Sequence, residues 1–134
     1  GEETGGVEAR LDADMGTLAR LERDLAGIPD EDKRALLESE SPELLKLLGE
    51  FQRCLAELRD TVHPLVRKLR AENAPTSKGL SYLELKQHLL LSYCINVSFY
   101  MLLKASGHPV RGHPVIKQLV RLRIVLERLR PLDG

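Results

Sequence analysis

Histidines in a repeated motif are the first candidates for chemistry in this chain. Residues 107–115 repeat the motif Gly-His-Pro-Val, which places His108 and His113 five positions apart. No carboxylate or cysteine joins them at ligand spacing, whereas a metal site needs three or four ligands. His113 stands between Gly112 and Pro114, so we expect it to be the N-cap of a helix that Pro114 opens. We therefore predict no metal site here.

The chain offers no recognisable set of catalytic residues. Cys54 and Cys94 lie far apart, without the spacing of a zinc site or a disulfide framework, which favours a reducing, intracellular compartment. No glycine-rich phosphate loop, His-Glu-x-x-His motif or activated nucleophile is present, and the many carboxylates fall on predicted helix faces. We predict a protein that is not an enzyme and binds no cofactor.

Opposite charges are divided between the two halves of the chain. Residues 1–60 contain 16 acidic and 8 basic residues, residues 61–134 contain 4 and 12, and the net charge is zero. Either the halves pack together with complementary charge, or the basic half contacts an acidic partner such as RNA. The candidates for RNA contact are Lys117, Arg121, Arg123, Arg128 and Arg130, with Arg67, Lys68, Arg70 and Lys78 upstream. No aromatic residues are interleaved with the first five for base stacking.

Helices must position all of these residues, because apolar residues recur at steps of three and four along most of the chain. The composition, 43% hydrophobic and 30% charged without tryptophan, also favours Leu-rich helices. We predict an all-α, four- to five-helix bundle in one domain over residues 7–134, after a disordered tail or cloning remnant at 1–6. Long helices are expected at 42–71, 80–106 and 114–130, a weaker helix at 14–27 and a short one at 30–38.

The helix predicted at 42–71 has the most regular pattern. Ser41 and Pro42 suit its N-cap and first helical position, and a loop is predicted after it at 73–79. Pro64 lies within it, so we expect a kink or break near Val62. Apolar residues that alternate steps of four and three predict a coiled-coil-like edge: Leu44, Leu48, Phe51, Leu55, Leu58, Val62, Leu65 and Leu69.

The helix predicted at 80–106 is apolar on nearly all sides. Ser81 and Glu84 fit a capping box at its start. Its other polar residues continue one winding row of four-residue steps, namely His88, Ser92, Asn96 and Lys104. Such a helix is normally buried, so it either forms the axis of the domain or waits in part for a second chain. Its longest uncharged stretch, 89–103, is shorter than the ~20 residues of a membrane span, and we predict none.

A partner chain would meet the apolar sides of this helix and of the helix predicted at 114–130. The residues expected to contact it are Leu83, Leu90, Leu91, Ile95, Phe99, Leu102, Val115, Leu119, Leu122 and Leu126. Two alternatives to a partner-binding module stay open. One is an RNA-binding element that uses the basic half, and the other is a structural bundle that associates with its own copies.

Several motifs in the second half of the chain resemble those of a known family. They are GLSYLELK at 79–86, LLSY at 90–93, GHPVI at 112–116 and LERLRPLD at 126–133. In this order they resemble the signature of the Sas-ten/Utp-three family, which also includes neuroguidin and the nuclear exosome cofactors. Upstream, ESPEL at 40–44 resembles the Sas-ten/Utp-three branch more than the neuroguidin branch.

The resemblance implies a nucleolar factor of the small-subunit processome that acts in ribosomal RNA maturation. It implies a location in the nucleus and nucleolus, with the pre-ribosomal particle as a partner, weak direct RNA contact at most, and no membrane. It also implies a helical domain that interlocks with the N-terminal helical region of the nuclear exosome's exonuclease. The apolar helix at 80–106 fits this expectation, because a module that shares a helical core with another chain has unpartnered apolar surface by itself.

Overall fold

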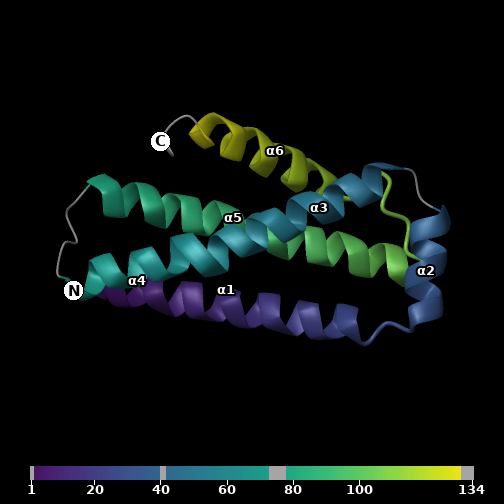
Figure 1. Cartoon of the computed structure of the whole chain (residues 1–134), viewed down its shortest axis with the longest axis horizontal. Helices are drawn as coiled ribbons and strands as arrows, with labels where there is room; N and C mark the ends of the chain where they lie inside the picture. The colour runs from purple at the N-terminus through teal and green to yellow at the C-terminus, as the bar shows by residue number, and fades with distance from the viewer. Residues whose placement is uncertain (1, 40–41, 73–77, 131–134) are drawn as a thin grey trace.

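Helix α5 (Lys78–Ala105) is the axis around which the other helices pack in the computed structural model (Figure 1). The other elements are, in chain order, α1 (Glu2–Ala26), α2 (Asp30–Ser39), α3 (Pro42–Glu57), the π-helical turn η1 (Leu58–Val62), α4 (His63–Ala71) and α6 (Pro114–Leu129). Because α3, η1 and α4 follow one another without a gap, they form the single long helix predicted at 42–71. The predicted all-α bundle is confirmed.

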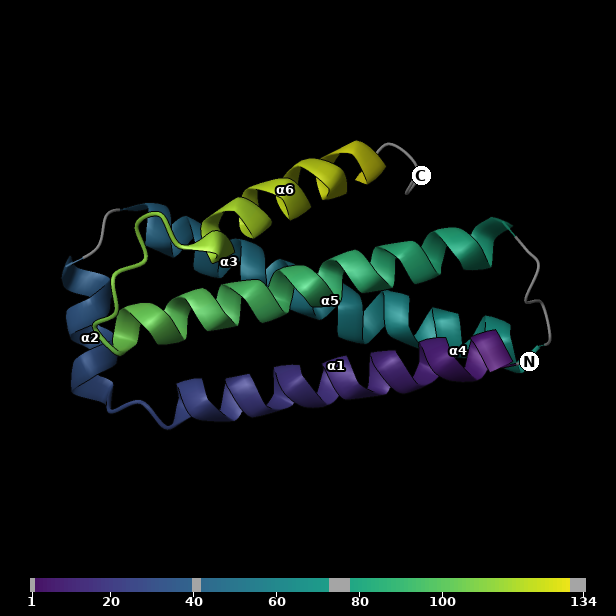
Figure 2. The same ribbon diagram turned by 180° about the vertical axis from the view of Figure 1, so that it is seen from behind.

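The structure describes residues 2–39, 42–72 and 78–130, and side chains at 12–35, 44–72 and 78–130. The predicted N-cap Ser41 and most of the predicted loop at 73–79 lie outside the described residues. Helix α1 and helix α6 lie on opposite sides of α5, and α3 crosses it (Figure 1). Seen from behind, α5 lies in front of α3 (Figure 2).

Helix α1 is longer than the sequence pattern predicted. The expected helix was 14–27, after a disordered tail at 1–6, whereas α1 begins at Glu2. Glycines at 5, 6 and 16 weakened the pattern, but each costs a helix only about 1 kcal/mol relative to alanine. Since α1 packs along α5, tertiary contact supplies stability that local propensity lacks.

The predicted kink or break near Val62 takes the form of the π-helical turn η1. The backbone N–H of His63 donates to the carbonyl of Leu58, five residues back, so the turn is wider than an α-helical one. This widening falls just before Pro64, which has no N–H to donate. It also moves the inward position after Val62 from Leu65, which is exposed, to Val66, which is buried. The predicted place of Leu65 in the apolar edge is therefore wrong.

The core consists of two apolar clusters that meet along α5. The first joins α1 to η1, α4 and the first half of α5, through Leu18, Leu58, Val62, Val66, Leu80, Leu90, Leu91 and Cys94. The second joins the second half of α5 to α6, with Tyr93, Val97, Met101, Val115 and Leu119 buried and Phe51 of α3 packed against both clusters. The axis alternative for α5 therefore accounts for most of its apolar surface, and its predicted polar row stays outside the core.

Helix α5 is also long and apolar enough to cross a membrane, judged by length and composition alone. In its most apolar window, 44% of the residues are buried inside the bundle. A core helix in a water-exposed bundle meets the same criterion, so this property is weak grounds for a membrane span.

One buried lysine gives a test of how charge is balanced in the core. The ammonium of Lys86 on α5 is buried and forms an ion pair with Glu57 on α3, whose side chain is 40% exposed. Glu57→Ala should lower the free energy of unfolding by about 1–3 kcal/mol, less than the loss for a fully buried pair because water reaches Glu57. Lys86→Met should change it by less than about 1 kcal/mol, because a methionine there needs no charge partner. Urea unfolding of the two variants measures both values, and equal losses would contradict this account.

Candidate protein-docking surface

Helix α6 is held at a defined angle by its N-terminal cap. His113 is the N-cap, and its Nδ1 accepts a hydrogen bond from the backbone N–H of Val115 at 3.0 Å. Pro114 occupies the first turn, where the missing N–H costs nothing. Gly112 has φ of +78°, a conformation that residues with a Cβ rarely adopt, and it lets the chain turn into the cap. The His113 ring also packs at 5.7 Å from the ring of Phe99 on α5.

A polar network fastens the middle of α6 to the bundle. The hydroxyl of Tyr93 donates to Oε2 of Glu50 at 2.7 Å, and Nη2 of Arg123 donates to the same oxygen at 2.8 Å. Burial raises the pKa of Tyr93 to about 12, so this phenol stays protonated and can donate. The network borders a hollow of about 430 Å³ between α3, α5 and α6. Arg123 therefore has a structural role as well as a positive charge.

The opposite side of α6 carries an exposed apolar row. Ile116, Val120 and Ile124 recur every four residues and are 36%, 52% and 47% exposed. Phe99 is 40% exposed and lies beside the first turn of α6 through its contact with His113. We call these four residues the α6 surface. An apolar row on the side of a helix that faces away from its own core is typical of a protein contact site.

Cations border this apolar row. Lys117 and Arg121 follow Ile116 and Val120 in the adjacent row of the helix, and Arg128 lies one turn beyond Ile124. All three are exposed. Of the other predicted RNA contacts, Arg123 is bound to Glu50, and Arg130 pairs with Glu127 at 2.9 Å. The basic residues of α6 thus divide into an outward border and two with carboxylate partners.

The predicted partner-contact residues fall into three groups by burial. Four are buried in the core, namely Leu90, Leu91, Val115 and Leu119. Five are partly buried, namely Leu83, Ile95, Leu102, Leu122 and Leu126. Phe99 alone in that set is exposed. A partner that docks on the closed bundle therefore meets Phe99 directly and reaches the first four only if helices separate.

Sequence reasoning missed the exposed row of α6. It followed the four-three seam from Val115, which the structure places against the core. The four-step row from Ile116 runs beside that seam, and a helix with two adjacent apolar rows has more apolar surface than one neighbour covers. Counting both rows would have revealed the outward one.

The predicted capping box at Ser81 and Glu84 differs from the structure. Helix α5 begins at Lys78, so Ser81 lies inside its first turns and is exposed. The carboxylate of Glu84 instead pairs with the guanidinium of Arg70 on α4, at 3.3 Å. Glu84 therefore ties α4 to α5, and the helix start is set further upstream than the motif suggested.

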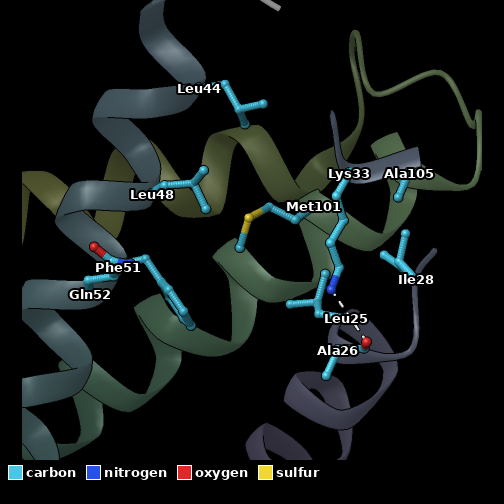
Figure 3. A pocket seen from close by; sticks show the side chains of 10 residues that line it. All are labelled: Leu25, Ala26, Ile28, Lys33, Leu44, Leu48, Phe51, Gln52, Met101 and Ala105. Atoms are coloured by element: carbon cyan, nitrogen blue, oxygen red, sulfur yellow. Dashed lines mark hydrogen bonds between the residues drawn. The ribbon is translucent and has the colours of Figure 1, made fainter. Parts of the chain in front are cut away.

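An apolar cavity of about 310 Å³ lies at the end of the bundle where α1, α2, α3 and α5 meet. Leu48, Phe51 and Met101 point toward it, and the ammonium of Lys33 donates to the carbonyl of Ala26 at its edge, at 3.3 Å (Figure 3). Its lining lacks acids, histidines and cysteines. The cavity could accept an apolar side chain, but it offers no groups for catalysis.

The remaining reactive groups are not arranged for chemistry. Burial raises the pKa of the Cys54 thiol to about 11 and that of Cys94 to about 12, so neither is a thiolate near neutral pH. Within residues 2–39, 42–72 and 78–130, no three histidine, cysteine, aspartate or glutamate side chains gather as metal ligands. The α6 surface is therefore the strongest candidate site in the described part of the chain.

Comparisons with known proteins agree with the motifs. The sequence model of the Sas10/Utp3 family matches residues 48–128. The chain is 41% identical over 114 residues to Something about silencing protein 10 of Mus musculus, which is 85% of this chain and 24% of that protein. It is 38% identical over 120 residues to the protein of the same name from Drosophila melanogaster, which is 90% of this chain and 28% of that one. Neuroguidin of Danio rerio is 35% identical over 98 residues, 73% of this chain and 31% of neuroguidin.

The chain thus spans about a quarter of the length of the first two relatives. No solved structure matches it. The family match covers more than half of the chain and includes η1, α4, α5 and most of α3 and α6. The chain therefore belongs to the Sas10/Utp3 family.

Proposed function

We propose that this domain is a protein-binding module that docks an amphipathic helix of a partner on the α6 surface. The observation that carries the proposal is the exposed row Ile116, Val120 and Ile124, which faces away from the core and continues into Phe99. The cationic border of Lys117, Arg121 and Arg128 favours a partner helix whose apolar side is flanked by acidic residues.

The setting we propose is ribosome biogenesis. Family membership supports a nucleolar factor in ribosomal RNA processing, within the small-subunit processome. As the partner we propose the N-terminal helical region of the nuclear exosome's exonuclease, which the family resemblance implied. In this role the domain performs no reaction and brings a nuclease to the pre-ribosomal particle.

Val120→Glu should abolish docking. A carboxylate at the most exposed position of the row places a charge in an apolar contact and next to an acidic partner, which we expect to weaken binding at least ~100-fold, or about 2.7 kcal/mol. The measurement is isothermal titration calorimetry with the N-terminal helical region of the exonuclease, supported by co-elution on size exclusion. Phe99→Glu should behave in the same way.

Leu45→Glu is the matched control, because Leu45 is an exposed leucine on α3, away from the α6 surface. It should bind like the unaltered domain, and circular dichroism should show that all variants keep their helices. If the unaltered domain does not bind the exonuclease region, that partner is wrong. Equal weakening by Leu45→Glu and Val120→Glu would show that docking does not use α6.

A further inference from the structure

A second hollow lies at the other end of the molecule from α2, between α1, α4 and α5. It measures about 360 Å³ and is lined by Asp12, His63, Val66, Arg67, Arg70, Ala71 and Gln87. Neither the docking proposal nor the core needs it. Unlike the apolar cavity near Met101, it is lined mainly by polar side chains.

A buried glutamine is the unusual feature of this hollow. The side chain of Gln87 is fully buried, and its Nε2 lies against Nδ1 of His63. Among the described residues, its Oε1 has no hydrogen-bond partner. A buried polar atom without a partner costs about 1–3 kcal/mol, so a glutamine at this core position is not explained by stability. Its contact does orient the imidazole of His63, in the way that a second hydrogen bond fixes a functional histidine.

The electrostatics of the hollow favour an anion. Arg67 is exposed at its rim, and Arg70 lies in its wall and pairs with Glu84. Burial and the charge of Arg67 lower the pKa of His63, and this outweighs the opposing effect of Asp12. The positive potential that disfavours a proton on His63 would stabilise a negative group in the same place.

We propose that this hollow binds a backbone phosphate of single-stranded RNA, held by Arg67 and by the imidazole of His63, with Gln87 as the residue that positions His63. Donors that converge from Arg67, Arg70 and His63 suit a tetrahedral phosphate with several acceptor oxygens better than a planar carboxylate. Lys68 and Lys78 are exposed on the neighbouring turns and could meet the adjacent phosphates of a chain. An apolar surface, which a protein ligand would need, is small here, since Val66 and Ala71 are the only apolar residues in the lining.

Fluorescence anisotropy with a labelled ten-nucleotide oligouridylate tests the proposal on the whole domain. Arg67→Glu should weaken binding at least tenfold at low salt and reduce the salt dependence by about one phosphate contact. Arg34→Glu on α2 makes the same change in net charge on an exposed arginine at the other end of the bundle, and it should weaken binding less than threefold. Equal losses in the two variants would overturn the site, as would no binding to the unaltered domain.

Nuclear magnetic resonance shows whether phosphate itself occupies the hollow. Inorganic phosphate should shift the ring protons of His63 but not those of His88, which is exposed on α5, and Arg67→Glu should remove the shift. Gln87→Leu should leave thermal stability unchanged or higher, yet reduce the His63 shift and the affinity for oligouridylate. If a glutamate-rich peptide displaces the oligouridylate from this site at equal concentration, the hollow is a carboxylate site and the RNA proposal is wrong. Docking of the exonuclease region should be unaffected by Arg67→Glu, so the two proposals fail independently.

Discussion

Replacing Leu91 by glutamate is expected to lower the free energy of unfolding by more than about 4 kcal/mol and to leave the domain largely unfolded. Leu91 is 1% exposed and lies in the cluster that joins α5 to α1 and to η1. A glutamate there would bury a carboxylate without a partner or be protonated at a similar cost. Since small domains have only about 5–15 kcal/mol of stability, one such change is enough. Urea unfolding followed by far-ultraviolet circular dichroism measures it.

Leu85→Glu is the matched control on the same helix. Leu85 is 48% exposed, so its replacement should change stability by less than about 0.5 kcal/mol. If Leu91→Glu were as stable as Leu85→Glu, α5 could not be the axis of a closed bundle. The pair also bears on docking, because loss of a partner in Leu91→Glu would report unfolding, whereas loss in Val120→Glu reports the surface.

The sequence was sufficient for the helices because their signals are local. Apolar steps of three and four mark each long helix, and Pro114 with Gly112 marks the start of α6 to the residue. The start of α5 was misplaced, since Ser81 and Glu84 match a capping box while the helix already runs through them. A motif of two residues records local propensity, and the contact between Glu84 and Arg70 is tertiary.

The surface was harder to predict than the fold. An apolar residue on a predicted helix can face the core or a partner, and periodicity does not distinguish the two when a helix has several apolar rows. Leu90 and Leu91 were expected at a partner and are core residues, while Val120 was overlooked and is exposed. The shift from Leu65 to Val66 was also beyond the pattern, because it depends on one wider turn before Pro64. Burial is decided by packing, which only the arrangement of all the helices shows.

Replacing Leu18 by alanine should lower the free energy of unfolding by about 2.7–5.0 kcal/mol, the range for leucines that leave a cavity in a core. Leu18 is fully buried and packs with Leu58, Val62 and Leu91, although α1 lies outside the residues that the family match covers. Leu45→Ala, at an exposed position on α3, should cost less than about 1 kcal/mol under the same urea unfolding.

The size of the Leu18 effect decides where the folding unit begins. A loss in the expected range, with one cooperative transition, would mean that α1 covers one side of α5 as an integral part of the bundle. Fragments that begin at the family match would then expose the Leu18 site on α5 and bind other apolar chains there. A loss below about 0.5 kcal/mol would contradict this, because α1 would then be an appendage, and the side of α5 that it covers would be open to a partner.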